Sequence, residues 1–278
     1  MARFDLGIAA GFGLDALAEA GMLAGASLDM DFAGNRIYGA SSFTSALAIT
    51  RASVGYAQNE AGVWSSFASG ELRLTDKGLL VEEARTNSIR NNSMQGAVAG
   101  TPGTISNTAT GTTGGLTQTV IGPGQENGID YVDINYAGIA SGTSINVRFE
   151  SPTIIAASVG QTWVGSVFAR KVADSGAASP TSPLLIVRGY DSGSVQTETG
   201  TTALNLAASS LSASRVSLVR TLNNASTAYV RTEHQVSLVV GQSYNFTIRI
   251  GWPQLELGAF ATSPIRATSA AATRAADV

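Results

Sequence analysis

The chain has no cysteine, one histidine and few charged residues, and each shortage excludes a class of chemistry. Without cysteine there are no disulfides, thiolate nucleophiles or sulfur ligands for a metal. Asp, Glu, Lys and Arg make up 13% of the 278 residues, about half of the usual quarter. The net charge is −3, and no run of Lys or Arg is long enough to neutralise several phosphates. The composition therefore argues against nucleic acid as a partner.

Long hydrophobic runs are missing as well. No apolar stretch reaches the roughly 18 to 20 residues that a membrane span needs, so we expect no span. Asp5, Asp15 and Glu19 interrupt the apolar N-terminal stretch, which argues against a signal peptide. Hydrophobic residues still make up 44% of the chain, and a weakly charged, apolar surface favours contacts with other subunits. We therefore expect a homo-oligomer.

The pattern along the chain predicts four segments. Residues 1–26 carry apolar residues at helical spacing between glycines, and we interpret them as a short helical or extended N-terminal attachment segment. Residues 27–95 hold short β-like pieces and predict a β-rich framework or connector. A Gly/Thr/Ser-rich tract then leads into a second domain, residues 96–262. Residues 263–278 are expected to form a C-terminal tail that packs on the framework.

Period-two patterns dominate residues 96–262. In "DYVDINYAG", Val132, Ile134 and Tyr136 share one face, and the following "INVRFE" repeats the alternation, which predicts a hairpin with one buried face. In "YNFTIRIGW" the alternate residues from Tyr244 to Trp252 are expected to point one way. Seven or eight such strands, without helical patterns between them, favour an antiparallel sandwich. We therefore predict an all-β fold, an antiparallel jelly-roll β-sandwich.

The polar faces of these strands offer the groups that sugars require, which are flat rings and planar polar side chains. Tyr190 and Asp191 are the favoured pair, because they lie at a strand end, where binding residues tend to occur. Trp163 and Trp252 are instead expected in the core, since their strand neighbours are apolar. The candidate carbohydrate-binding residues are Tyr131, Asp133, Arg148, Arg188, Tyr190, Asp191 and Arg231.

No catalytic constellation is predicted. Glu82 and Glu83 in "VEEART" are adjacent on a strand and point to opposite faces, so they cannot flank one glycosidic bond. We expect an ion pair with Arg85 there instead. His234, in "VRTEHQVS", has no Ser or Asp motif that would complete a triad. The sequence thus gives no support for an enzyme.

Sugar-binding jelly rolls often hold a structural calcium ion through loop carboxylates and backbone carbonyls. Some carboxylates of this chain are therefore candidate calcium ligands. Glu126, Asp130 and Asp174 are such candidates, but none lies in a calcium-loop signature. We assign no metal ligand and no other cofactor.

Four motifs flank the predicted sandwich: "LDMDFA" from Leu28, "ITRAS" from Ile49, "GLLVEEARTN" from Gly78, and "PQLELGAFATS…TRAADV" at the end. In this order they resemble the framework of tailed-phage and prophage fibre or spike proteins. The resemblance covers about residues 28–90 and 252–278. Given the short chain, the head-spike fibre of a phage-like gene transfer agent is the member of this group that it resembles best.

The resemblance implies a fibre on the surface of a virion or phage-like particle, made in the bacterial cytoplasm. It implies that the N-terminal segment holds the fibre on another virion protein and that a carbohydrate-binding-like jelly roll binds the host's capsular polysaccharide. The echo between "ITRAS" and "ATRAA" (residues 272–276) predicts that the tail folds back beside the framework. Two alternatives stay open, a purely structural decoration or connector subunit and a capsule depolymerase or deacetylase.

Overall fold

The computed structural model describes residues 29–278 except 35, 39, 41, 106 and 151–154. The predicted attachment segment, residues 1–26, lies outside the described residues. The chain divides into two compact units, one of Met1–Ala84 with Arg274–Val278 and one of Arg85–Thr273. None of the helices in the described part of the chain is long and apolar enough to cross a membrane.

Within its described residues, the first unit contains three two-stranded antiparallel sheets and one short helix. Each sheet joins neighbouring strands, β1 with β2, β3 with β4 and β5 with β6. The Ser42 side chain caps the helix by accepting a hydrogen bond from the Ser45 amide. The elements are β1 (Asp29–Asp31), β2 (Arg36–Tyr38), α2 (Phe43–Ala46), β3 (Gly55–Gln58), β4 (Trp64–Phe67), β5 (Leu74–Thr75) and β6 (Gly78–Leu79).

The C-terminal residues complete this first unit. The backbone amides of Thr50 and Val278 each donate to the other's carbonyl, at 2.7 and 3.1 Å, and the Ala275 amide donates to Ser53 Oγ. The carboxylate of Asp277 binds the guanidinium groups of Arg51 and Arg73, and all three side chains have no exposed surface. The two echoing segments therefore lie together. Arg51 of the first forms an ion pair with Asp277, and Arg274 of the second forms one with Glu82.

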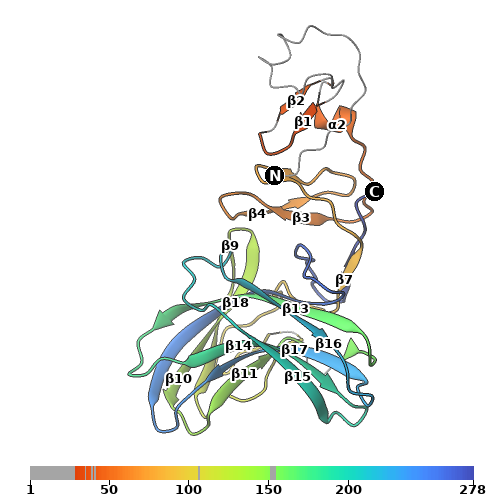
Figure 1. The fold of residues 1–278 in the computed structure, drawn as a ribbon. Helices are drawn as coiled ribbons and strands as arrows, with labels where there is room; N and C mark the ends of the chain where they lie inside the picture. The colour runs from red at the N-terminus through yellow and green to blue at the C-terminus, as the bar shows by residue number, and fades with distance from the viewer. Residues whose placement is uncertain (1–28, 35, 39, 41, 106, 151–154) are drawn as a thin grey trace. The chain divides into compact units, whose positions relative to one another are not determined.

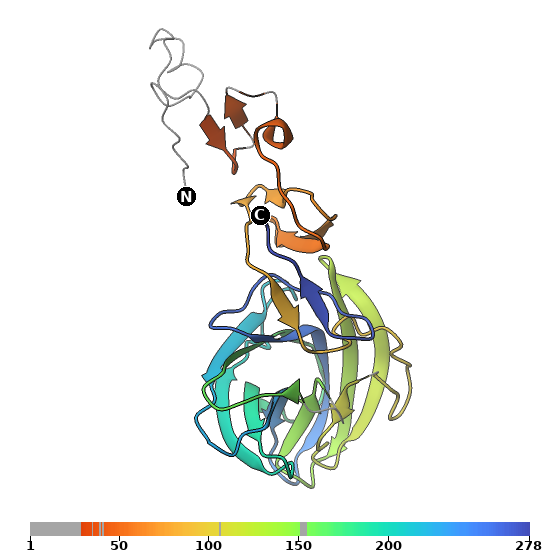
Figure 2. The ribbon, with the colours of Figure 1, turned by 90° about the vertical axis from the view of Figure 1, so that its right-hand side faces the viewer.

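The described residues of the second unit form two large antiparallel sheets. One has the order β16-β13-β18-β10-β9, and the other has the order β15-β14-β17-β11-β8, with β12 also paired to β17. In Figure 1, β13 and β18 lie in one layer and β14, β11 and β17 in the other, and Figure 2 shows the strands curving around a shared interior. The strands are β8 (Ala109–Thr110), β9 (Thr117–Glu126), β10 (Ile129–Ile139), β11 (Ser144–Arg148), β12 (Ile155–Ala156), β13 (Thr162–Asp174), β14 (Thr181–Tyr190), β15 (Gln196–Ala203), β16 (Arg215–Thr221), β17 (Tyr229–Ser237) and β18 (Ser243–Leu257).

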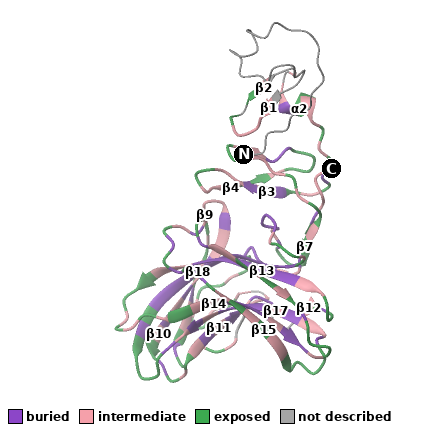
Figure 3. Ribbon diagram, in the orientation of Figure 1, coloured by how far each residue is buried: buried purple, intermediate pink, exposed green. Residues whose placement is uncertain are grey.

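The core lies between the two sheets and follows the predicted alternation. Val132, Ile134 and Tyr136 of β10 pair directly with Ile250, Ile248 and Phe246 of β18, and each is at most 1% exposed. Figure 3 shows such buried residues along β18 and β13. Directly paired residues share a face of a sheet, so these positions form one apolar surface. The predicted all-β antiparallel jelly-roll sandwich is confirmed.

Two local predictions in this region are wrong. The strand β10 does not pair with β11, because β10 lies between β9 and β18 in one sheet while β11 lies between β8 and β17 in the other. Trp252 also breaks the alternation of β18, with a φ of 37° next to a register shift. Its ring packs edge-on against Phe168 and its Nε1 donates to Asp130.

The boundary between the units lies earlier than the predicted 95/96 junction. Ile89 and Met94 are 0% and 1% exposed and belong to the sandwich core, so the chain enters the sandwich at Arg85. Residues 263–273 also belong to this unit, because the Ile265 and Ala267 amides donate to Gln254 and Asn92. Only Arg274–Val278 group with the first unit. The strands β7 (Arg85–Asn87) and β19 (Ala272–Arg274) pair where the chain enters and leaves.

Candidate carbohydrate-binding faces

The seven candidate sugar-binding residues lie on two different sheets. Tyr131 and Asp133 are on β10 of the five-stranded sheet, whereas the others belong to the six-stranded sheet or the turn after β14. The expectation that Arg148 lies on a strand paired with β10 is therefore wrong. The structure brings four of the seven together, Arg148, Arg188, Tyr190 and Arg231, on the solvent-facing side of the six-stranded sheet.

The register of three strands produces this grouping. Arg148 on β11 pairs with Glu233 on β17, and Arg188 on β14 pairs with Arg231 on β17. The intervening positions, such as Val147 and Val187, point into the core. Because side chains alternate across a strand, the arginines and Glu233 share the opposite face. We call this face, with Arg148, Arg188, Tyr190, Arg231 and Glu233, the Glu233 face.

Glu233 is the centre of this face, and its side chain is only 3% exposed. Its carboxylate lies 2.8 Å from Arg231 Nε, 3.3 Å from Arg188 Nε and 3.8 Å from Arg148 Nε. The Arg231 guanidinium also stacks 4.3 Å from the centre of the Tyr190 ring and donates to its hydroxyl. Sequence reasoning missed Glu233, although it stands two residues from Arg231 on the same strand face.

Tyr190 holds its proton in this setting. Burial, followed by the charge of Glu233, raises the pKa of Tyr190 above its ordinary value, although the neighbouring guanidinium groups oppose the shift. A protonated phenol hydroxyl is both a donor and an acceptor, and it lies 3.4 Å from Glu233 Oε1. Tyr190 therefore supports the face rather than presenting a free ring, since it is 8% exposed.

Amide side chains border the arginines. Asn146 on β11 donates to Gln235 on β17 at 3.1 Å, and Arg188 donates to Gln196 on β15. Guanidinium and amide groups are planar and offer several donors in fixed directions. The Glu233 face therefore carries the kind of polar groups that sugar hydroxyls and carboxylates pair with.

Asp191, half of the favoured pair, has a local structural role. Its Oδ1 accepts hydrogen bonds from the amides of Gly193 and Val195, at 2.9 and 2.8 Å, and so closes the turn between β14 and β15. The joint role of Tyr190 and Asp191 in sugar binding stays a prediction.

On the five-stranded sheet, Tyr131 and Asp133 belong to a separate group. Arg249 of β18 forms a bidentate pair with Asp133, at 2.9 and 2.8 Å, and contacts Glu126 at 2.6 Å. Its guanidinium carbon lies 3.7 Å from the Tyr131 ring centre. The hydrogen bonds to Asp133, together with Glu126, raise the pKa of Arg249 despite its partial burial. These charges already satisfy one another.

The calcium candidates are occupied by protein donors. Glu126 accepts from the Leu211 amide, Asp130 from Arg266 at 2.6 Å, and Asp174 from Ser179 at 2.5 Å. Burial alone would raise the pKa of Glu126, but the Leu211 and Arg249 hydrogen bonds lower it. Within the described residues, no three His, Cys, Asp or Glu side chains gather as a metal site would require.

The remaining singled-out residues have structural surroundings. Trp163 and Trp252 are buried, at 5% and 1% exposure, as predicted. Glu82 forms ion pairs with Arg73 and Arg274. Arg85 lies over the Phe260 ring and donates to the Leu257 carbonyl.

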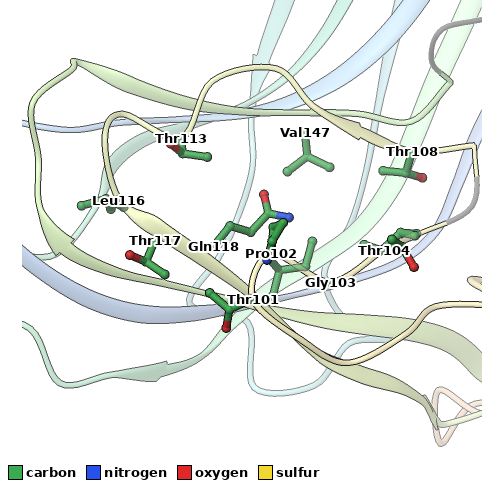
Figure 4. Close-up of a pocket in the computed structure, with 12 residues that line it drawn as sticks. Thr101, Pro102, Gly103, Thr104, Thr108, Thr113, Leu116, Thr117, Gln118 and Val147 are labelled. Carbon is green, nitrogen blue, oxygen red and sulfur yellow. The ribbon is translucent and has the colours of Figure 1, made fainter.

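A cavity of about 550 Å³ opens elsewhere, beside the first residues of β9. Its described lining is neutral, with threonines set around Pro102 and Gln118 in Figure 4 and with Ile134 and Val147 contributed by the two sheets. The Thr108 hydroxyl is buried and forms no hydrogen bond within the described residues. None of the predicted sugar-binding residues lines this cavity.

No protein-family model matches the chain, and no curated protein matches it. Among solved structures, the enzymatically active domain of tailspike protein 4 of bacteriophage CBA120 is similar, at 16% identity and a TM-score of 0.39. That match covers 62% of this chain and only 21% of the tailspike chain. A CBM4 structure matches at 16% identity and a TM-score of 0.35, covering 62% of this chain and 100% of that one.

A third structure, described as a carbohydrate-binding module of the β-sandwich superfamily, matches at 10% identity and a TM-score of 0.36. It covers 81% of this chain and 82% of its own. The sandwich itself is established by the strand pairing given above.

Proposed function

We propose that this protein is a non-enzymatic, glycan-binding fibre or spike on the surface of a phage-like particle, and that it attaches the particle to host capsular polysaccharide. The observation that carries the proposal is the Glu233 face, where Arg148, Arg188 and Arg231 converge with amide side chains on one rigid sheet. The resemblance of the flanking motifs to phage fibre and spike proteins supports the particle-surface role.

The test blocks this face without removing any of its groups. Thr199 on the edge strand β15 is exposed and pairs directly with Arg188, so its side chain shares the face. Thr199→Trp is expected to reduce binding of the protein to capsule-bearing cells by at least about tenfold, a loss of ~1.4 kcal/mol. Val219→Trp is the matched control, because Val219 is 45% exposed on β16, the edge strand of the other sheet.

Equal binding to capsule-bearing and capsule-free cells would refute the proposal, as would a Thr199→Trp variant that binds like the wild type. The decoration or connector alternative predicts the first of these results. For the enzyme alternative, purified polysaccharide is incubated with the protein, and chain length and released acetate are measured. Shortened chains or free acetate would show a depolymerase or deacetylase.

A further inference from the structure

The charges on the Glu233 face do not balance. Three guanidinium groups surround one carboxylate, so three positive charges stand against one negative and leave a net +2. The strands contribute no other charged side chain to this face within the described residues. The excess is unusual for this chain, whose net charge is −3.

By contrast, the ion-paired side chains of the five-stranded sheet are balanced in charge. On the five-stranded sheet, Arg249 and Arg170 are matched by Asp133 and Glu126. The pair Arg266–Asp130 and the pair Lys171–Asp174 are likewise one to one. A general shortage of carboxylates in the sandwich therefore does not explain the excess on the Glu233 face.

Glu233 cannot satisfy all three arginines. Each guanidinium has five N–H donors, and the carboxylate has two oxygens. Arg148 is the least engaged, since its one ion-pair contact among the described residues is the 3.8 Å approach to Glu233 and its Nε forms no hydrogen bond. Its side chain is also the most accessible of the three, at 37% exposure against 19% for Arg188 and 14% for Arg231. That Nε is itself buried, so the donors of Arg148 that are open to a ligand are those of its Nη groups, which form no hydrogen bond within the described residues.

We infer that the Glu233 face selects acidic glycans and that Arg148, with Arg188 and Arg231 behind it, binds the anionic group of the sugar. The inference rests on the proposed function and adds the class of glycan. Arginine pairs with a planar carboxylate or a tetrahedral sulfate or phosphate through two parallel hydrogen bonds. A sugar carboxylate placed there would lower the excess from +2 to +1, since the three arginines face one glutamate.

The experiment measures binding of the full chain to galacturonate oligosaccharides and to the same oligosaccharides with their carboxyl groups reduced to alcohols. We expect at least about tenfold tighter binding to the acidic form, since charge-assisted hydrogen bonds are roughly twice as strong as neutral ones. Raising the ionic strength from about 0.05 to 0.5 M should erase most of the difference by screening. Sulfated and phosphorylated oligosaccharides, as further arms, identify which anion is preferred.

Two substitutions on the Glu233 face should change the affinity for the acidic oligosaccharide in opposite directions. Arg148→Gln keeps an amide donor but removes the charge, and it should remove most of the acidic preference. Glu233→Gln removes the competing carboxylate and should strengthen binding of the acidic form severalfold, a result that a merely structural role of the cluster would not give. Arg170→Gln, from the balanced five-stranded sheet, is the control and should change the affinity less than about twofold. Near-ultraviolet circular dichroism verifies that each variant is folded.

The results of these experiments distinguish failure of this inference from failure of the proposed function. Equal binding of acidic and reduced oligosaccharides, both blocked by Thr199→Trp, would overturn this inference and leave the proposed function standing. Absence of binding to any glycan, on oligosaccharides or on capsule-bearing cells, would overturn both. An acidic preference that survives Arg148→Gln unchanged would also overturn the assignment of the anion to this face.

Discussion

His234 is the only histidine of the chain, and it lies inside the sandwich, where Val147 and Leu185 are its direct neighbours on the adjacent strands. It is 1% exposed, and neither ring nitrogen forms a hydrogen bond within the described residues. Burial therefore lowers the pKa of His234 from 6.5 to about 4. The imidazole is a neutral core side chain rather than a catalytic base.

This burial predicts a loss of stability in mild acid. Between pH 6.5 and 4 the unfolded chain binds a proton at His234 that the folded chain does not, so the free energy of unfolding falls as the pH falls. The expected loss between pH 7 and 5 is about 2 kcal/mol. Urea unfolding of the wild type at pH 7, 6 and 5 measures it, and His234→Leu should show a much flatter profile.

Four carboxyl groups with shifted pKa values act mainly below that pH window. The pKa values of Glu126, Asp174, Glu198 and Asp277 are lowered from ordinary values of 4.5 or 3.8, because their hydrogen bonds outweigh the opposing effect of burial. Their contribution to stability is present above those values and is lost only at lower pH. A wild-type profile that is flat from pH 7 to 5 would show that the buried imidazole is hydrated or paired in solution.

At the scale of the strand, alternation predicted which residues are buried but not which strands are neighbours. The buried face of β10 was correctly predicted from Val132, Ile134 and Tyr136. The predicted pairing of β10 with β11 was wrong, because a hairpin and a crossover between two sheets give the same period of two. The consequence for the candidate site was direct, since Arg148 lies on a different sheet from Tyr131 and Asp133.

The candidate site was only partly predictable, because alternation gives the face of a residue but not its neighbours on other strands. Arg188 and Arg231 were singled out as polar residues on strand faces, and their meeting depends on the register between β14 and β17, which local sequence does not fix. Glu233 was missed because the "TEHQ" context suggested only a histidine site, although its spacing of two from Arg231 placed both on one face. Asp191 was given a binding role on its position alone, and its carboxylate closes the local turn.

The C-terminal residues Arg274–Val278 are predicted to stabilise the first unit. A chain truncated after Thr273 loses Asp277 and leaves the fully buried Arg51 and Arg73 without that carboxylate. Removing one partner of a buried ion pair costs about 3–5 kcal/mol. Hydrogen exchange read by mass spectrometry should therefore show faster exchange in β3–β6, while β10 and β18 of the sandwich remain protected.

A point substitution separates the ion pair from the backbone contacts. Asp277→Asn should reproduce most of the effect, and Glu60→Gln, which removes a carboxylate from an exposed position of the same unit, should stay within about 0.5 kcal/mol of the wild type. Unchanged exchange in β3–β6 after truncation would show that the first unit folds without residues Arg274–Val278. A fragment used to isolate the sandwich must span 85–273, since Ile89 and Ala267 are both buried in it.

At the scale of the whole molecule, the proposed function requires firm adhesion from a shallow site. The Glu233 face is a sheet surface, and a few charge-assisted contacts on such a surface give weak binding of a single sugar segment. Several copies joined in one fibre convert later contacts into intramolecular events and gain about 10² to 10⁴ in apparent affinity. A repeating polysaccharide presents many equivalent segments, so it is the kind of ligand on which an oligomeric fibre gains most.

Multivalent attachment predicts that the apparent affinity of the full-length protein depends on the density of its ligand. On sensors coated sparsely and densely with the same acidic polysaccharide, the apparent Kd should fall by about 10² or more at high density, mainly through slower dissociation. Thr199→Trp should weaken binding by at least about tenfold at both densities, because it blocks each site. A density-independent Kd, together with a monomer in sedimentation, would contradict multivalent attachment, and the particle would then need a different source of adhesion than repeated copies of this face.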